Sequence, residues 1–453
     1  MKRLSVLALG LGLVAIGCGE AQAPVEEPGG IALVGGQLID GTGSDPLADS
    51  VVVIRDGRIV SAGTREDTPV PAGADVIDAT GKTIIPGLVN LHVHYRGGPE
   101  TIEQQFRSQL YYGVTTARSI GSDSPESVAY LLEANAGRPG APRPYTAGIG
   151  FSHPNGFNAA GRNAPTTEEE ARALVRAQTD LGVHFIKMWV TEMPEPGLQI
   201  TPEMRTVIVD EAIKNGAIPV AHIDGEEEGL QLMEAGGRDF LHTTIRTFGP
   251  GGGTPVDDPE PSPAFLQMAR DNGVGFTPTL SIIQNGWHFA ERPELLNDPA
   301  LRAVFNPDAL ARWDDPETRA AVVEDPAFAD RKAAFRQLQD FVKTIHDAGI
   351  KVALGNDAGT PNVPFGWGMH HEMEMYVEAG LTPMQTIVAA TATGAGMLPP
   401  VGQADFGTLQ AGKVADLIVL NADPLADIRN TLEIDRVMRL GEWVEREGLL
   451  PTP

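Results

Sequence analysis

The sequence has little cysteine and little positive charge. Cys18 stands alone among 453 residues, so the chain can form no intrachain disulfide and no thiolate metal site. Nitrogen and oxygen ligands must therefore hold any metal. The 34 lysines and arginines are outnumbered by 60 aspartates and glutamates, which gives a formal charge of −26. An acidic chain of this kind is a poor partner for nucleic acid or for anionic lipid surfaces.

The N-terminus has the pattern of an export signal. Lys2 and Arg3 precede an apolar stretch, Leu4–Ile16, that is too short to span a bilayer comfortably. This stretch leads into Cys18, and a lone cysteine directly after a small residue resembles a bacterial lipoprotein signal, in which the cysteine is lipidated. Ordinary cleavage near 21–23 stays open as the alternative. We therefore expect an exported bacterial protein, periplasmic or on the cell envelope, that meets the membrane only through a lipid anchor at Cys18.

The sequence pattern predicts β-rich segments at both ends of the chain and an α/β region between them. The two ends contain short strands and turns, including a hairpin around Asp56-Gly57, and are expected to build one small β-sandwich. The centre alternates strand and helix in eight units, which is typical of a (β/α)8 TIM-like barrel. The expected bounds are 1–17 for the signal peptide, 18–30 for a flexible tether, 31–82 and 399–453 for the sandwich, and 83–398 for the barrel.

A buried strand predicted over Thr83–His94 carries the first candidate metal ligands. Side chains alternate across a strand, so His92 and His94 point to one side at its C-terminal end. Chemistry in such barrels lies at the C-terminal ends of the strands. Polar residues at other predicted strand ends are Lys187, His222, His242 and Asp357. Each has an ordinary structural explanation alone, but their joint occurrence favours one shared site.

These residues carry a resemblance to the amidohydrolase superfamily of metal-dependent hydrolases. The matching segments are Pro86–His94, Phe185–Lys187, Ala221-His222, Phe240–His242, Leu354–Asp357 and Gly407–Leu420. Within the superfamily the chain is similar to the binuclear branch related to imidazolonepropionase and amidohydrolase-type Xaa-Pro dipeptidases. The fourth barrel strand carries a lysine, Gly148–His153 resembles the Gly-His loop of that group, and His371–Ile387 matches a further motif.

The resemblance implies a site for two divalent metal ions, usually zinc. It divides the ligands as follows: His92, His94 and Asp357 hold one ion, His222 and His242 hold the other, and Lys187 bridges them as a carbamate formed with CO2. Two neighbouring ions lower the pKa of a bridging water enough to give hydroxide near neutral pH. Asp357 can take the proton on attack and pass it to the leaving amine.

Three further residues are weaker candidates for substrate binding. His153 is expected to face the substrate as a donor to an oxyanion or a carboxylate. Tyr95 and Arg96 directly follow the first metal strand and could reach a substrate carboxylate. An ordinary role as loop residues is the alternative for both.

The favoured function is metal-dependent hydrolysis of an amide or peptide-like bond in a small substrate or short peptide, as in a dipeptidase or carboxypeptidase. Hydrolysis of cyclic amides, lactones, other esters or phosphoesters by the same site is an alternative. A second alternative is a non-catalytic, ligand-binding lipoprotein, but the complete set of metal ligands argues against it. The substrate, the native metal and any oligomer stay open.

Overall fold

The computed structural model describes residues 29–157, 159–192, 195, 197–245 and 253–450. The predicted signal peptide at 1–17, the predicted lipidation site at Cys18 and nearly all of the predicted tether at 18–30 lie outside this range. No helix in the described range has both the length and the apolar character that crossing a bilayer requires.

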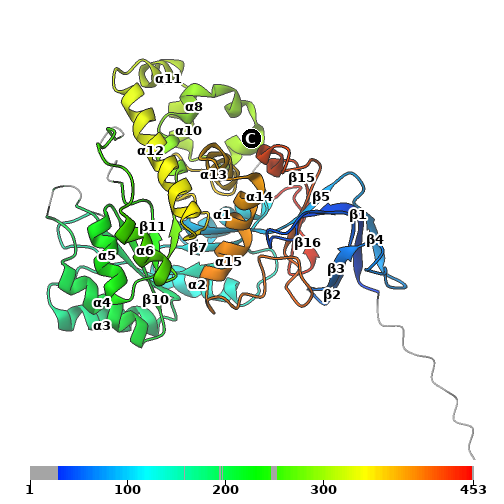
Figure 1. The fold of residues 1–453 in the computed structure, drawn as a ribbon, viewed down its shortest axis with the longest axis horizontal. Coiled ribbons are helices and arrows are strands. Elements are labelled where there is room, and N and C mark those ends of the chain that lie inside the picture. The colour runs from blue at the N-terminus through cyan, green and yellow to red at the C-terminus, as the bar shows by residue number, and fades with distance from the viewer. Residues whose placement is uncertain (1–28, 158, 193–194, 196, 246–252, 451–453) are drawn as a thin grey trace, which may run out of the picture.

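Strands from both ends of the chain share one eight-stranded sheet, which lies on the right in Figure 1. Its strands are β1 (Ile31–Leu38), β2 (Leu47–Arg55), β3 (Arg58–Thr64), β4 (Asp75–Asp78), β5 (Thr83–Pro86), β14 (Leu417–Leu420), β15 (Ile434–Arg439) and β16 (Glu442–Trp443). The predicted hairpin turn is confirmed, since Asp56 and Gly57 have positive φ and connect β2 to β3. β14 pairs antiparallel with β5, so the C-terminal segment completes a sheet begun near the N-terminus. The pairings join one sheet, and the sandwich stays a prediction.

Eight further strands, in groups of three and five, run parallel within each group. They are β6 (Leu88–Val93), β7 (Val114–Ser119) and β8 (Arg143–Thr146), followed by β9 (Phe185–Val190), β10 (Ile218–Ile223), β11 (Asp239–Leu241), β12 (Gly275–Thr277) and β13 (Lys351–Val352). Backbone hydrogen bonds join the two groups at both seams. Phe151 N donates to Lys187 O at 2.7 Å, and Leu91 N donates to Leu354 O at 2.9 Å. The C-terminal ends of these strands therefore lie at a common edge.

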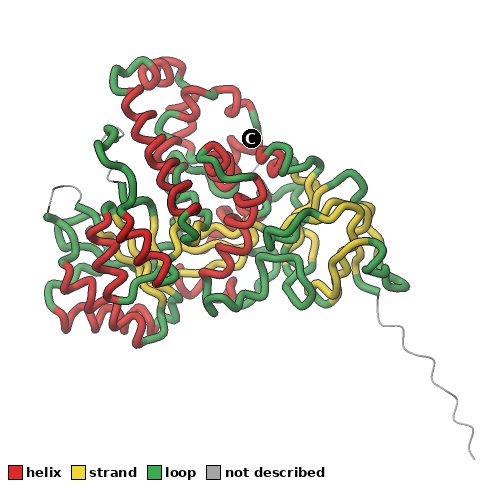
Figure 2. The backbone as a smooth tube through the Cα atoms, in the orientation of Figure 1, coloured by secondary structure: helices red, strands yellow, loops and turns green. Residues whose placement is uncertain are grey.

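Helices connect the parallel strands and cover them (Figures 1 and 2). The connecting helices are α1 (Pro99–Tyr111), α2 (Pro125–Asn135), α3 (Glu168–Asp180), α4 (Pro202–Lys214), α5 (Glu226–Ala235), α6 (Pro263–Asp271), α7 (Ser281–Gln284), α8 (His288–Glu291), η1 (Pro293–Asn297), α9 (Pro299–Val304), α10 (Pro307–Asp314), α11 (Pro316–Val323) and α12 (Phe328–Asp347). After β13 follow α13 (Trp367–Glu378), α14 (Pro383–Val388), η2 (Ala389–Thr393) and α15 (Gly394–Met397), and η3 (Ile428–Leu432) lies between β14 and β15. Several starts follow from sequence, because Ser124, Thr201 and Ser262 cap helices whose next residue is proline.

The strand predicted over Thr83–His94 is in fact two strands that belong to different sheets. The chain leaves β5 and enters β6 at Gly87, whose N–H donates to Asp416 O at 2.9 Å. A Cβ at this position would lie 2.3 Å from Thr115 Oγ1, so only glycine permits the close approach. Residues 83–86, which the prediction assigned to the barrel, therefore pair with strands of the eight-stranded sheet.

Aromatic packing holds the parallel strands against their helices. The Phe276 ring in β12 lies 5.6 Å from Phe240 in β11 and 5.6 Å from Phe341 in α12, between ring centroids. All three side chains are buried, and burying a phenylalanine stabilises the fold by about 1.5–3 kcal/mol. This packing gives the strand ends a rigid base. β11, β12 and β13 are short, with three, three and two residues.

Candidate metal centre

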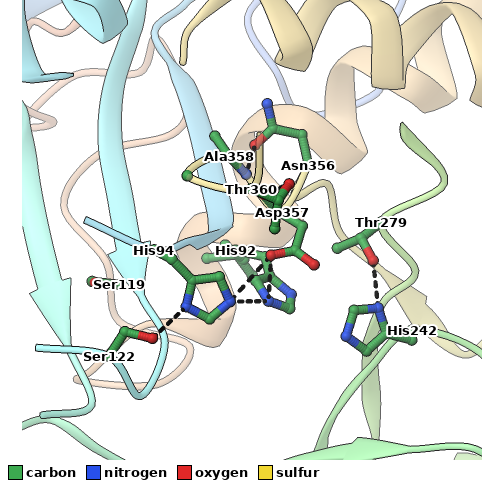
Figure 3. A network of polar contacts seen from close by, with 12 residues as sticks. His92, His94, Ser119, Ser122, His242, Thr279, Asn356, Asp357, Ala358 and Thr360 are labelled. Carbon is green, nitrogen blue, oxygen red and sulfur yellow. Dashed lines mark hydrogen bonds and ion pairs between the residues drawn. The ribbon is translucent and has the colours of Figure 1, made fainter. Parts of the chain in front are cut away.

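Three candidate ligands meet where β6 ends and the turn after β13 begins; His92, His94 and Asp357 are called the β6 side (Figure 3). The Nε2 atoms of the two histidines lie 3.3 Å apart. Asp357 Oδ1 lies 3.1 Å from His94 Nε2 and 3.5 Å from His92 Nε2. Two backbone hydrogen bonds hold the segments together: His94 N donates to Ala358 O at 2.7 Å, and Asp357 N donates to His92 O at 2.9 Å. Backbone register therefore fixes the β6 side.

His222 in β10 and His242 after β11 form a second group, called the β10 side. Their ring centroids lie 4.1 Å apart, and the His242 ring lies 5.1 Å from that of His92. One ligand atom each of His92, His242 and Asp357 lies within 4.8 Å of the others, so the two sides meet. Lys187 comes from β9, which is paired with β10. Its side chain is buried, and its Nζ has no hydrogen-bond partner among the described residues.

Three turns at the strand ends have left-handed backbone. His242 has φ 68°, Thr279 has φ 55° and Asp357 has φ 58°; they follow β11, β12 and β13. Such a conformation costs a non-glycine residue about 1–3 kcal/mol and persists only where the surrounding structure imposes it. This strain redirects the side chains at the strand ends, where sites of chemistry commonly lie.

Thr279 determines which nitrogen of His242 carries the proton. Its hydroxyl donates to Pro278 O at 2.7 Å and lies 2.6 Å from His242 Nδ1. A hydroxyl has one proton, so towards the ring it acts as acceptor. His242 is therefore protonated on Nδ1, and its Nε2 carries the lone pair that a metal needs.

Polar side chains also lie beside one ring nitrogen of His94 and of His222. Ser122 Oγ is 3.0 Å from His94 Nδ1, on the edge of the ring away from Asp357 (Figure 3). Asp224 Oδ1 is 3.0 Å from His222 Nε2, and because a carboxylate only accepts, that Nε2 carries a proton. Outer partners of this kind orient imidazoles around metal ions.

Burial determines the charge of the candidate ligands. It lowers the pKa of His92, His94 and His242, so these rings are neutral near pH 7. Burial also lowers the pKa of Lys187 well below its ordinary range, which favours the free amine. For Asp357 burial raises the pKa, but the neighbouring imidazoles outweigh it and hold the carboxyl ionised.

These residues fit divalent metal ions. Neutral imidazoles and an ionised carboxylate are the nitrogen and oxygen ligands that zinc takes in proteins. Buried polar atoms are rarely left without a partner, yet Lys187 Nζ has none in the described part of the chain. A neutral, buried amine beside such ligands is suited to capture CO2, which would add two anionic oxygens at this point.

Glu372 in α13 holds the segment after Thr279 and was not identified from the sequence. Its buried carboxylate accepts hydrogen bonds from Leu280 N at 2.7 Å, Ser281 N at 2.8 Å and Ser281 Oγ at 2.6 Å. Ser281 Oγ also lies 3.1 Å from the carbonyl oxygen of Asn356, which precedes Asp357. Burial raises the pKa of Glu372 to about 7. The sequence showed a motif here, but helical spacing does not reveal which distant turn a side chain contacts.

The structure corrects the prediction for Tyr95. This residue is only 2 % exposed, and its hydroxyl donates to Gln109 Oε1 at 2.7 Å. Its ring stacks on Phe365 with 5.9 Å between centroids. Tyr95 is therefore a core residue, because a strand end in this fold continues into packed structure before the first helix begins.

Arg96 and His153 are on the surface or half-buried, and their substrate roles stay predictions. Arg96 Nε donates to Gly359 O at 3.2 Å, which ties the residue to the turn that follows Asp357. His153 Nδ1 accepts a hydrogen bond from Asn155 N at 3.2 Å.

The chain belongs to the amidohydrolase family, whose sequence profile matches residues 83–444. This confirms the resemblance recognised from the strand-end motifs. As a member of this metal-dependent family the protein is a hydrolase, and His92, His242 and Asp357 form its candidate metal site.

Individual relatives align along most of the chain. Ochratoxinase of Aspergillus niger is 24 % identical over 477 aligned positions, which cover 92 % of this chain and 87 % of the relative. Imidazolonepropionase of Streptomyces griseus is 27 % identical over 416 positions, covering 85 % and 89 %. A solved Bifidobacterium longum structure, provisionally described as a prolidase, has a TM-score of 0.71 at 28 % identity and covers 94 % of this chain and 96 % of its own. The likeness implies an α/β fold with a TIM-like barrel.

Proposed function

We propose that this protein uses two divalent metal ions, expected to be zinc, to hydrolyse an amide or peptide-like bond of a small substrate. One observation carries the proposal: His92, His242 and Asp357 bring ligand atoms within 4.8 Å of one another, although they come from distant parts of the chain. Two relatives support amide chemistry, namely imidazolonepropionase and the Bifidobacterium longum structure provisionally described as a prolidase. A dipeptidase or carboxypeptidase is the leading form.

Each side chain has a proposed role. The ions, when bound, would polarise the scissile carbonyl and acidify a water molecule. Asp357 accepts the proton of the attacking water and returns it to the leaving amine, so it acts as base and then as acid. Lys187 reacts with CO2, forms an N–C bond and releases one proton, and the resulting carbamate supplies negative charge between the two sides. His222 and His242 hold the second ion.

We also infer the finer organisation from the sequence pattern. The parallel strands close into a (β/α)8 barrel over 88–398, and the chain ends, 31–86 and 399–453, build a β-sandwich. Residues 1–17 act as an export signal, and Cys18 is lipidated, which places the enzyme in the bacterial periplasm or on the cell envelope. Mass spectrometry of the mature N-terminus tests this: a diacylglyceryl-modified Cys18 supports it, and an unmodified N-terminus after residue 23 overturns the anchor.

A substrate screen tests the hydrolase proposal. Zinc-loaded protein is incubated with a panel of dipeptides and N-acyl amino acids, and release of free amino groups is measured. Turnover on at least one of them, lost in Asp357→Asn, is the expected result. No turnover on this panel, with turnover on lactones, cyclic amides or phosphoesters, would replace amide hydrolysis by that chemistry.

A further inference from the structure

Arg162 lies beside the candidate metal centre without a carboxylate partner. Its Nη2 donates to Ser122 Oγ at 3.2 Å, the same hydroxyl that lies beside His94 Nδ1. Its Nε is buried and has no hydrogen-bond partner within the described ranges. Among the described residues no acidic side chain comes within ion-pair distance of it, although the chain as a whole is strongly acidic. An unsatisfied, partly buried guanidinium is costly unless a ligand completes it.

The position of Arg162 is fixed by an aromatic ring that it shares with the bridging lysine. The guanidinium carbon lies 4.9 Å from the centroid of the Trp189 ring. Lys187 Nζ lies 5.3 Å from the same ring. Both Lys187 and Trp189 belong to β9 and project to one face of the strand because they are two residues apart. Arg162 therefore lies one aromatic ring away from the bridging position.

Arg96 adds a second guanidinium at this edge. It follows His94 by two residues, and its charge lowers the pKa both of His94 and of Arg162, after the larger effect of burial in each case. Arg96 is tied to the turn after Asp357, since its Nε donates to Gly359 O at 3.2 Å. The positive charges of Arg96 and Arg162 repel each other, and a bound anion would lower that repulsion.

Asp123 interacts with both arginines by charge but is hydrogen-bonded to hydroxyl groups. Its Oδ1 accepts a hydrogen bond from Ser119 Oγ at 2.7 Å, and its Oδ2 accepts one from Thr146 Oγ1 at 2.6 Å. In the described part of the chain neither arginine forms an ion pair with it. The N–H groups of Arg162 thus remain available to a ligand.

A cavity of about 570 Å³ adjoins Arg96. Its walls include Thr360 from the turn after Asp357 and the apolar side chains of Phe305 and Phe365, and no aspartate or glutamate lines it within the described ranges. Neither Arg162 nor a candidate metal ligand lines this cavity, so it offers room beyond the centre for an apolar group of the substrate.

We propose that Arg162, assisted by Arg96, binds the carboxylate of the substrate, so that the preferred substrates are short peptides with a free C-terminus or N-acyl amino acids. The proposal rests on the proposed function and narrows its substrate class. In these compounds the carboxylate is only a few bonds from the scissile carbonyl, so it must lie at the edge of the same centre. A guanidinium can bind a carboxylate through two parallel hydrogen bonds. Arg162 takes the role for which the sequence had offered Tyr95 and Arg96 as weaker candidates.

Binding measurements test this without requiring turnover. Zinc-loaded protein is titrated calorimetrically with N-acetyl-phenylalanine and with its C-terminal carboxamide. The wild type should bind the acid more tightly. Arg162→Met keeps an apolar side chain over Trp189 but removes the charge, and should weaken binding of the acid by about 10-fold to 100-fold while leaving the carboxamide nearly unchanged. Arg162→Lys should restore part of the preference, because it keeps charge but not the paired hydrogen bonds.

Arg312→Met is the matched control. Arg312 also stacks on a tryptophan, Trp313, at 5.0 Å, and contacts no candidate ligand, so its loss should leave both affinities unchanged. Equal affinity of the wild type for acid and carboxamide, or equal weakening of both by Arg162→Met, would overturn the proposal. If the wild type prefers the acid but hydrolyses no substrate of the panel, the carboxylate-binding site stands and the proposed peptide hydrolysis is refuted. The failure of one proposal can therefore be distinguished from the failure of the other.

Discussion

The β6 side and the β10 side of the candidate metal centre are built differently. On the β6 side, backbone hydrogen bonds between β6 and the turn after β13 hold His92, His94 and Asp357 with polar atoms 3.1–3.5 Å apart. On the β10 side, His222 and His242 are oriented by the side chains of Asp224 and Thr279. Backbone pairing also holds the β10 side, since His222 lies in β10 between β9 and β11 and His242 N donates to Thr277 O at 2.9 Å. The sides differ in that the β6 side brings three ligands into mutual contact, whereas the β10 side has two rings and would need Lys187 to complete it.

The largest expected effect comes from a substitution on the β6 side that removes proton transfer and keeps the metal ligand. Asp357→Asn keeps the size of the side chain and an oxygen ligand but cannot accept the proton. We expect metal to be retained and kcat to fall by at least about 1,000-fold, near the upper range for loss of a general acid–base group. Steady-state kinetics and elemental analysis of the same sample measure this. Asp347→Asn, on the exposed part of α12, is the control, and an active Asp357→Asn enzyme would remove Asp357 from proton transfer.

Substitution of Lys187 tests whether the two sides differ in their need for the carbamate. Lys187→Ala deletes the amine that would form the carbamate, so at least one of the two expected metal ions should be lost, first from the β10 side. Metal per chain is measured after reconstitution with zinc and bicarbonate. Lys332→Ala, which removes an exposed lysine paired with Glu291 at 2.7 Å, should keep the wild-type count. Two ions retained by Lys187→Ala would refute the bridge.

A smaller change tests whether the β10 side depends on its side-chain partners. Thr279→Val removes the hydroxyl that fixes the tautomer of His242, and should weaken binding of the second ion by about tenfold. Thr279→Ser keeps the hydroxyl and should restore affinity. Competition with a chromogenic chelator gives both constants. If Thr279→Val and Thr279→Ser bind zinc alike, the hydroxyl does not orient the ring.

The smallest expected effect concerns Glu372, whose carboxylate accepts hydrogen bonds from Leu280 N and Ser281 N, just after Thr279. Its pKa in the folded protein is raised by burial from 4.5 to about 7, so the folded state holds the proton more tightly than the unfolded state. The stability this adds is complete below the ordinary pKa and is lost as pH rises through about 7. The wild type should therefore lose stability between pH 5 and pH 8, whereas Glu372→Gln does not titrate. The difference between the Tm of the variant and the Tm of the wild type should increase by roughly 2 °C over this range.

Glu374→Gln is the control on the same helix. Burial raises the pKa of Glu374, but His371 and Arg292 outweigh it and hold the pKa below the ordinary value. This carboxyl is ionised throughout pH 5 to 8, so its substitution should give a Tm difference that does not change with pH. A pH-independent difference for Glu372→Gln as well would mean that Glu372 does not titrate in this range.

Much of the centre could be predicted from local rules. Alternation along β6 puts His92 and His94 on one face, and parallel strands bring the ends of β10 and β11 to the same edge. The break at Gly87 could not be predicted, because the apolar run continues through it and only contact with Thr115 requires glycine. Glu372 and Arg162 were missed for the same reason: their roles depend on turns and rings far away in the chain.

The number of metal ions bound by the wild-type protein is the most direct test of the proposed two-metal site. The protein is purified without chelators, reconstituted with zinc and bicarbonate, and analysed for metal per chain. We expect about two zinc ions per chain, with the first bound more tightly than the second because the β6 side brings three ligands together. No bound metal after reconstitution would contradict the two-metal site and would favour a ligand-binding protein that keeps the fold without the chemistry.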